Sequence, residues 1–368
     1  MAPRPVLFVT SEFPPSGAGI GVFVRSLARA LGSRGRECWV ATWGKIPELD
    51  PAGRIIRIPF VPVPPVGDKL FARALRKLLK NSSIEDSIVN VHSPYPQSAT
   101  VCDIATFHIV VKNLLSHGQF TGLKRAQYKL GFPSLCRNEQ QLLESKTVCA
   151  VSEAVAKDLA AEYGFDEDVR IVGNAVDSSF FKPGTKSKEP RVLYAGRLDL
   201  NKGVLDFVRL ARLVRMRFPT AKFRMVGRGS ARSLIVREIR RLGLKQSFNL
   251  PGYVPLDALL EEYQKAWVYV SPTRFEGFAT SILEAMACCT LPVVSEIPSN
   301  KEMLSRQEGL FASSRTIEEY ADLVTWALSN GDQADQMARK ARERAIHDYS
   351  WEKVAQRYEA MLNGLDRP

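Results

Sequence analysis

The sequence predicts an α/β protein built from two doubly wound, Rossmann-like domains. Its 368 residues are too many for one ordinary domain. Short apolar strands alternate with amphipathic helices, the pattern of a mostly parallel sheet. This alternation restarts after a stretch at 178–190 whose Ser, Lys, Pro and Gly content is typical of a linker. We therefore expect domains at 1–185 and 186–348, followed by a terminal helix at 349–368.

The first half begins with an apolar strand at 6–10, a loop at 11–21 and an amphipathic helix at 22–35. Helical patterns separate the buried strands that we expect next, at 38–42, 88–93, 101–108 and 147–152. In the second half, strands are expected at 191–198, 221–227, 247–252, 267–272 and 290–296, with helices at 203–218, 231–241, 256–266 and 350–365. In open parallel sheets, ligands bind beyond the carboxyl ends of the strands, so the loops at those ends are the candidates for a site.

Composition narrows the compartment and the partners. No apolar run approaches the roughly 20 residues that cross a bilayer, and the first residues lack the apolar core of a signal peptide. Six cysteines without metal-ligand spacing suit a reducing compartment. We expect a cytoplasmic protein, or one peripheral to the inner face of the membrane.

The net charge of +12 is unevenly distributed. Residues 191–245 contain fifteen Lys or Arg and three acids, a surplus as large as the net charge of the whole chain. Such a surface attracts phosphates of any kind. However, we find no zinc finger, recognition helix or RNA-binding aromatic signature, so nucleic acid is not the expected partner.

A second basic segment lies at 69–80. Leu70, Phe71, Ala74, Leu75 and Leu78 recur at helical spacing, and the opposite face carries Lys69, Arg73, Arg76, Lys77 and Lys80. The helix either exposes solvated cations or lies on an anionic membrane surface. With the apolar segment at 60–66 it could dock at a membrane that carries a lipid-linked acceptor.

Two glycine-rich loops suggest close approach to a ligand. In the first half, Gly17, Gly19 and Gly21 lie between a strand and a helix, where a helix N-terminus favours an anion. Their spacing is not that of a dinucleotide-binding loop. In the second half, "MVGRGS" places Gly227 and Gly229 after a strand, where they could border a nucleotide base.

Cations and carboxylates follow other strands of the second half. "AGRLDLNKG" places Arg197 and Lys202 before a helix N-terminus, an arrangement that suits a diphosphate. Glu276 lies in the loop after "WVYVSP" and Glu284 lies in the next helix, which we expect to start near Thr280 or Ser281. A loop carboxylate can accept bonds from sugar hydroxyls, the exposed amides that follow can hold a phosphate, and a helical carboxylate can reach a ribose diol.

In these motifs the chain resembles the retaining GT-B fold glycosyltransferases of the family-four group, which use nucleotide-activated sugars. The resemblance covers nearly the whole length through the glycine loop, "VCAVSEAVAKDL", "VGNAVDSSFFKP", "AGRLDLNKG", "EGFATSILEAMA" and "SWEKVAQRYEAML", in that order. It implies two domains that face each other across a cleft, with the last helix, from Trp351 to Leu362, folding back onto the first domain.

The resemblance also implies roles for residues. Glu276 would bind the hydroxyls of the donor sugar with help from the amides of Gly277, Phe278 and Ala279. Glu284 would bind the ribose, while Arg197 and Lys202 would hold the diphosphate. Gly19 would approach the donor from the first domain, and His108 would face the sugar near the reacting centre. The same pattern adds the following residues to the donor site: Gly21, Gly196, Gly227, Ser281, Ile282 and Leu283. His92, also at a strand end, is expected to be structural. No metal or other cofactor is expected.

The sequence departs from the common family pattern at Ala279, Ser281 and Ala175, where many relatives have glycine, proline and glycine. These changes leave open which base and sugar are used. We expect a hexosyltransferase that moves a sugar from UDP or GDP to a glycan or lipid-linked acceptor in cell-envelope or exopolysaccharide synthesis. An epimerase or hydrolase acting on a nucleotide sugar remains an alternative, and a non-enzymatic nucleic-acid-binding protein is a remote one.

Overall fold

The computed structural model describes residues 3–10, 13, 19–42, 54–58, 66–80, 84–92, 102–113, 122–313 and 315–365. These residues form two compact units. Unit 1 contains the described residues up to 175 together with 351–365, and unit 2 contains those from 176 to 350. The units thus divide at 175/176 and 350/351, where the sequence placed the boundaries at 185/186 and 348/349.

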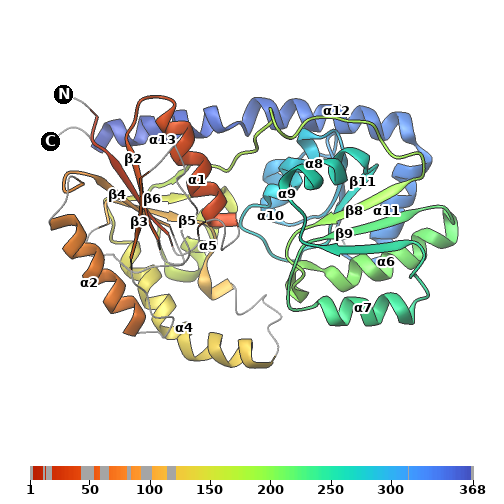
Figure 1. Cartoon of the computed structure of the whole chain (residues 1–368), viewed down its shortest axis with the longest axis horizontal. Helices are drawn as coiled ribbons and strands as arrows, with labels where there is room; N and C mark the ends of the chain where they lie inside the picture. Colours follow the sequence, from red (N-terminus) through yellow and green to blue (C-terminus); the bar gives the residue numbers. More distant parts are fainter. Residues whose placement is uncertain are drawn as a thin grey trace. The chain divides into compact units, whose positions relative to one another are not determined.

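Unit 1 is a parallel sheet with helices on both sides (Figure 1). Its strands are short, and the central strands β1, β4 and β5 are buried throughout, as in sheets covered on two faces. They lie in the order β3-β2-β1-β4-β5-β6-β7. Their bounds are β1 (Val6–Val9), β2 (Cys38–Thr42), β3 (Arg54–Arg57), β4 (Ile88–His92), β5 (Ile104–Phe107), β6 (Thr147–Ala150) and β7 (Val169–Ile171). The helices are α1 (Gly19–Gly32), α2 (Val66–Lys80), α4 (Gly122–Leu142), α5 (Glu153–Tyr163) and α13 (Trp351–Leu365).

The last helix of the chain packs beside the first. Figure 1 shows α13, in blue, next to α1, in red, and the two helices share one apolar core with the strands. Phe23 and Leu27 of α1 are buried in it, as are Tyr358 and Leu362 of α13. Burial of four large side chains, at about 1.5–3 kcal/mol each, explains why a helix more than three hundred residues away returns to this sheet.

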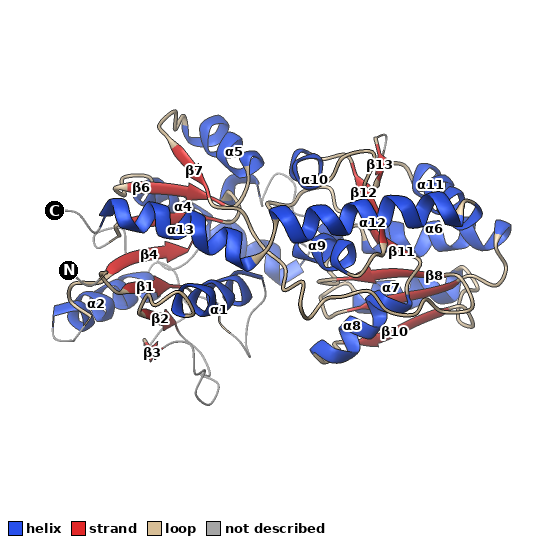
Figure 2. Cartoon of the chain, turned by 90° about the horizontal axis from the view of Figure 1, so that it is seen from above, coloured by secondary structure: helices blue, strands red, loops and turns tan. Residues whose placement is uncertain are grey.

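Unit 2 repeats the architecture with strands in the order β10-β9-β8-β11-β12-β13, all parallel (Figure 2). Its strands are β8 (Arg191–Ala195), β9 (Lys222–Val226), β10 (Phe248–Gly252), β11 (Val268–Ser271), β12 (Leu291–Ser295) and β13 (Leu310–Ala312). The helices are α6 (Val204–Arg217), α7 (Arg232–Arg241), α8 (Leu256–Lys265), α9 (Thr280–Ala287), α10 (Pro298–Met303), α11 (Ile317–Ser329) and α12 (Gly331–Asp348), with a short 3₁₀ turn η2 (Leu200–Lys202). Two doubly wound parallel sheets confirm the predicted fold class.

The stretch at 178–190 behaves differently from the linker that its composition predicts. Phe181 is buried with its ring centroid 5.9 Å from that of Tyr263. The Nζ atom of Lys186 donates to the carbonyl oxygens of Ala266 and Cys289 at 2.6 and 2.9 Å. An aromatic anchor and a buried ammonium group therefore fix this segment to unit 2, although its polar composition is that of a free linker.

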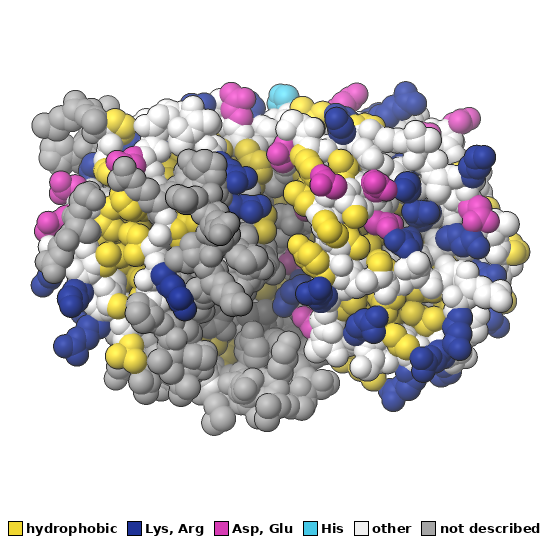
Figure 3. Space-filling view, viewed as in Figure 1, with side chains coloured by type: hydrophobic (Ala, Val, Ile, Leu, Met, Phe, Trp, Pro, Cys, Tyr) yellow, Lys and Arg dark blue, Asp and Glu magenta, His cyan; other side chains and the backbone are white. Residues whose placement is uncertain are grey.

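The basic surplus of 191–245 is partly neutralised within unit 2. Arg209 and Arg241 both pair with Glu238, Arg217 pairs with Asp322, and Arg224 pairs with Glu262. Figure 3 shows Lys and Arg side chains scattered over this unit with acidic side chains among them. Part of the basic surplus is thus paired with acids of the same unit, and the absence of a nucleic-acid partner stays a prediction. Within the described part of the chain, no helix is both long and apolar enough to cross a membrane.

Candidate functional site

Two glycines bring the strand-end loops of unit 2 into contact. Gly203 follows η2 and precedes α6 with φ +68°, and a Cβ atom there would lie 2.1 Å from the carbonyl oxygen of Pro272. A Cβ atom at Gly227 would lie 1.8 Å from the carbonyl oxygen of Gly196. Any larger residue would clash with backbone at both positions, so the loops after β8, β9 and β11 meet only because these residues are glycine.

Lys202 and Glu276 form an ion pair at this edge. Lys202 ends η2, after β8, and Glu276 follows β11, seventy-four residues later. Their side chains are only 14% and 22% exposed, so little water screens the pair. The structure thus joins the cation that we expect at the diphosphate to the carboxylate that we expect at the sugar hydroxyls.

Arg197 lies in the same edge but faces solvent. Its side chain is 55% exposed and Nη1 lies 3.3 Å from Oδ2 of Asp199. The other Asp199 oxygen accepts from the backbone N–H and the hydroxyl of Ser230 at 3.0 and 2.7 Å. Asp199 therefore orients Arg197 and ties the loop after β8 to the loop after β9. Our sequence reasoning missed this residue, although its place between the two expected cations was visible.

The segment between the two glutamates is buried, where we expected exposed amides. Gly277, Phe278 and Ala279 are all buried, and the Phe278 ring packs 5.8 Å from that of Tyr349. The expected helix start is close, because α9 begins at Thr280 after Ala279. Ile282 and Leu283 are fully buried in the core, so their side chains hold α9 on the sheet.

Glu284 lies in the second turn of α9 and is held by a tyrosine of α8. The hydroxyl of Tyr263 donates to Oε2 of Glu284 at 2.7 Å. Burial raises the pKa of Glu284 to about 7, and this hydrogen bond opposes part of the increase. A second tyrosine, Tyr269, donates to the hydroxyl of Ser281 at 2.8 Å. The acid that we expect at the ribose is therefore poised between its neutral and charged forms near neutral pH.

In unit 1, the predicted glycine loop is partly helical. We expected the helix to start at 22, but α1 begins at Gly19, so Gly19 and Gly21 lie in its first turn. The N–H groups of a first turn have no partners within the helix, and this earlier start aims them at the region before it. A Cβ atom at Gly19 would meet nothing within 4 Å, whereas Gly21 is buried. Gly17 lies outside the described residues.

His108 follows β5 and contacts a second histidine. Its Nε2 atom lies 3.0 Å from Nδ1 of His92, which ends the neighbouring strand β4, and the ring of Phe23 packs edge-on at 4.9 Å. Burial lowers the pKa of His108 to about 3, and burial together with His108 lowers the pKa of His92 well below its usual value. Both rings are therefore neutral at physiological pH. This pairing gives His92 a defined partner at the strand edge, and its structural role stays a prediction.

The basic helix α2 carries its charges outward. Phe71 and Leu75 are buried, whereas Leu70, expected on the apolar face, is 47% exposed. Arg73, Arg76, Lys77 and Lys80 are exposed, while the side chain of Lys69 and the segment at 60–65 lie outside the described residues. The amphipathic pattern is therefore real, but the buried face of α2 is narrower than we predicted.

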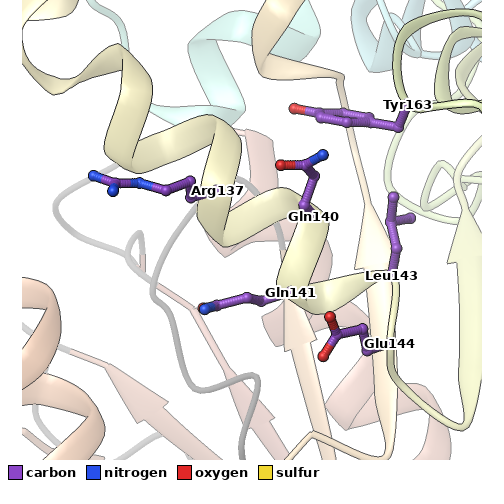
Figure 4. A pocket seen from close by; sticks show the side chains of 6 residues that line it. All are labelled: Arg137, Gln140, Gln141, Leu143, Glu144 and Tyr163. Carbon is purple, nitrogen blue, oxygen red and sulfur yellow. The ribbon is translucent and has the colours of Figure 1, made fainter.

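A separate hollow of unit 1 contains none of the predicted site residues. It lies at the end of α4 and is lined by Arg137, Gln140, Gln141, Leu143, Glu144 and Tyr163 (Figure 4). The Tyr163 hydroxyl donates to Oε2 of Glu139 at 2.7 Å. Most of these side chains are exposed, and we assign the hollow no role. Among the described residues, no group of three or more His, Cys, Asp and Glu could hold a metal ion; metal independence stays a prediction.

Two family models match consecutive parts of the chain. The family model of glycosyl transferases group 1 matches residues 175–344, and that of glycosyltransferase family 4 matches residues 17–180. Sucrose-phosphate synthase from Thermosynechococcus elongatus superposes with a TM-score of 0.85 at 20% identity, covering 98% of this chain and 99% of that one. This likeness shows the fold.

Curated relatives match at low identity. A GDP-mannose:cellobiosyl-diphosphopolyprenol alpha-mannosyltransferase from Xanthomonas oryzae is 29% identical over 66% of this chain and 65% of its own length. A glycogen synthase from Mycobacterium tuberculosis is 26% identical over 51% of this chain and 46% of its own length, so the chain spans about half to two thirds of these relatives. A GDP-mannose-dependent alpha-(1-6)-phosphatidylinositol monomannoside mannosyltransferase from Mycobacterium tuberculosis is 23% identical over 98% of both chains.

Proposed function

The chain belongs to the family-four group of GT-B glycosyltransferases, and from that premise we propose that it transfers a hexose from a GDP- or UDP-sugar to a glycan or lipid-linked acceptor, with retention of configuration. The observation that carries the proposal is the partly buried pair of Lys202 and Glu276 at the strand edge of unit 2, with Glu284 behind it. A cation beside two carboxylates matches a ligand that has a diphosphate next to sugar and ribose hydroxyls.

The chemistry that these residues support is departure of a nucleoside diphosphate. As the bond to the sugar breaks, negative charge grows on the leaving phosphate, and Lys202 and Arg197 are the cations that would stabilise it. Preorganised charge of this kind is often the largest catalytic contribution. When the donor binds, the ion pair between Lys202 and Glu276 separates. Lys202 then contacts the diphosphate, and Glu276 accepts hydrogen bonds from the sugar hydroxyls.

Retention can arise through a covalent glycosyl intermediate or through same-face attack, and the proposed site residues include no spare nucleophile for the first route. Glu276 and Glu284 already have binding roles, and His108 is neutral because burial lowers its pKa to about 3. We therefore propose attack on the same face from which the diphosphate leaves, with the leaving phosphate accepting the proton of the acceptor hydroxyl. Isolation of a glycosyl group covalently bound to the protein would contradict this mechanism.

Donor and acceptor are best tested together. Two of the relatives are named for GDP-mannose and for lipid-linked acceptors, which supports GDP-mannose and a polyprenyl-diphosphate glycan as the first pair to assay. The chain is incubated with labelled GDP-mannose or UDP-glucose, with and without acceptor, in the presence of EDTA. We expect nucleotide release that needs the acceptor and does not need a metal, and a product with the anomeric configuration of the donor. Donor consumption without acceptor would instead favour the epimerase or hydrolase alternative.

We propose, separately, that α2 attaches the protein to anionic membrane. The exposed Arg73, Arg76, Lys77 and Lys80 support this proposal, because each cation near an anionic surface contributes about 1 kcal/mol of attraction. Replacing these four residues by Gln should release the protein from vesicles that contain phosphatidylglycerol. Replacing four exposed cations of unit 2, Arg212, Arg232, Arg237 and Lys245, controls for net charge. Equal binding by both variants would exclude α2 as the contact.

A further inference from the structure

Tyr263 occupies an unusual position for a buried aromatic residue. It lies on α8 with no exposed surface, and its ring is fixed between those of Phe181 at 5.9 Å and Tyr269 at 5.8 Å. Its hydroxyl donates to Oε2 of Glu284 at 2.7 Å and lies 3.2 Å from the carbonyl oxygen of Ser281. A rigid ring therefore delivers one donor to the carboxylate and to the first turn of the helix that carries it.

Only one oxygen of Glu284 is used in this way. Among the described residues, Oε2 accepts from Tyr263, while Oε1 has no hydrogen-bond partner in the protein and is not one of the fully buried polar atoms. Because Tyr263 fixes Oε2, the carboxylate of Glu284 cannot rotate freely. The tyrosine therefore also sets the direction in which Oε1 points. A diol that binds to Oε1 then finds its acceptor already oriented, which reduces the entropy lost on binding.

We propose that Tyr263 is a positioning residue, whose hydroxyl holds one oxygen of Glu284 so that the other accepts the hydroxyls of the ribose of the donor; this inference rests on the proposed function. Nothing in the apolar pattern of α8 distinguishes Tyr263 from an ordinary core residue. Its hydrogen bond to Oε2, its own complete burial and the unused Oε1 atom of the half-buried Glu284 are what distinguish it.

The charge of Glu284 depends on the same contact. Burial raises the pKa of Glu284 to about 7, and the Tyr263 hydroxyl lowers it by binding the charged form. The pKa of Tyr263 is itself raised well above its usual value, by burial first and then by Glu284, so the hydroxyl keeps its proton and donates. The other titratable groups nearby are Tyr269 of β11 and Cys288 at the end of α9. On α12, which packs on α9, Arg342 donates to the carbonyl oxygen of Ala287.

The test compares binding of GDP and of 2′,3′-dideoxy-GDP by calorimetry between pH 5.5 and 8.5, or of UDP and its dideoxy analogue if UDP is the nucleotide that binds. The ratio of the two affinities cancels the ionisation of the phosphates and isolates the ribose contact. The variants are Tyr263→Phe and Glu284→Gln, with Tyr269→Phe as a matched control. Tyr269 is equally buried and contacts Ser281, but donates no hydrogen bond to Glu284.

For the wild type, we expect the preference for GDP over dideoxy-GDP to fall as the pH drops below about 7. In Tyr263→Phe, we expect this preference to be about tenfold weaker at pH 7 and its pH midpoint to be about one unit higher, since a hydrogen bond to a charged group is lost. Glu284→Gln should abolish the pH dependence, and Tyr269→Phe should behave as the wild type. A loss of packing alone would weaken both nucleotides equally and would not move the midpoint.

The outcomes separate this inference from the proposed function. A wild type that binds neither GDP nor UDP contradicts both. A second outcome contradicts only the role of Tyr263. In it, Glu284→Gln weakens nucleotide binding, whereas Tyr263→Phe leaves unchanged both the affinity ratio of GDP to dideoxy-GDP and the pH midpoint of that ratio. If Tyr263→Phe does not fold, the double variant with Glu284→Gln removes the buried charge that the first change leaves without a donor. Its affinity should equal that of Glu284→Gln within twofold, and a further tenfold loss would overturn the inference.

Discussion

The two units place titratable side chains at equivalent positions, beyond the ends of parallel strands, yet treat them differently. In unit 1, His92 and His108 contact each other in a buried site, and burial lowers both pKa values so that the pair stays neutral. In unit 2, Lys202 pairs with Glu276, and Glu284 is held by Tyr263 with a pKa of about 7. Burial alone makes a base neutral and an acid neutral; partners decide which groups remain charged. The comparison teaches that unit 2 keeps charged groups at its strand ends, as the proposed diphosphate site requires, while unit 1 keeps neutral hydrogen-bonding groups there.

The largest expected effect comes from breaking the charged pair of unit 2. Lys202→Met removes the cation proposed for the leaving diphosphate and leaves Glu276 without its partner. We expect kcat to fall by about 10²–10³-fold, as when one preorganised donor is removed from other active sites. Steady-state kinetics with whichever of GDP-mannose and UDP-glucose serves as donor measure the change. Lys301→Met, at an exposed pair with Glu296, is the control. An undiminished kcat would show that the neutral site of unit 1 suffices for catalysis.

A smaller effect is expected from disturbing the loop that carries Lys202. Gly203→Ala must accommodate a Cβ atom 2.1 Å from a backbone oxygen at φ +68°. Gly243→Ala meets nothing within 4 Å at the same φ of +68°, and so isolates the cost of the backbone angle, about 1 kcal/mol. We expect Gly203→Ala to lower the unfolding free energy of the protein by at least 2 kcal/mol more than Gly243→Ala, measured by urea unfolding. Equal losses would mean that the loops of unit 2 are not held by close contact.

The smallest effect is a pair of opposite pH dependences. Glu284 has a folded-state pKa raised from 4.5 to about 7, so its contribution to stability is present below 4.5 and is lost as the pH rises through 7. His108 has a pKa lowered from 6.5 to about 3, so its contribution is present above 6.5 and is lost as the pH falls towards 3. Each slope is at most about 1.4 kcal/mol per pH unit.

Urea unfolding from pH 4.5 to 7.5 measures these slopes as differences between variant and wild type. Relative to wild type, Glu284→Gln should gain stability as the pH rises, and His108→Gln should gain stability as the pH falls. The contrast between the two units would be contradicted if the stability difference from wild type changed with pH in the same direction for both variants, or did not change with pH for either.

The sequence predicted the fold and the loops that carry Lys202 and Glu276, but it did not predict which neighbouring side chains contact the site residues. Strand-end position placed Lys202 and Glu276 in loops at one edge of the sheet, where the structure has them, because parallel topology sends both loops to that edge; their binding roles stay predictions. It missed Tyr263 and Asp199, because apolar periodicity makes Tyr263 a core residue and gives no sign that its hydroxyl meets a residue of another helix. The start of α1 at Gly19 was also missed, since glycine is a poor helix former whose propensity was overridden by tertiary packing. The segment at 178–190 was predicted to be a linker because most of its residues are polar. Overall composition does not reveal the contacts of Phe181 and Lys186, which fix the segment to unit 2.

The most direct test of the account is thermal unfolding of the wild type and of Glu284→Gln in the presence of GDP, UDP, ADP or CMP. The account predicts that GDP or UDP raises the unfolding temperature of the wild type, with about 2.7 kcal/mol of stabilisation at a hundredfold excess over Kd, and that Glu284→Gln loses much of this gain. An unfolding temperature that none of the four nucleotides changes would contradict the assignment of the unit 2 edge as a nucleotide-sugar site.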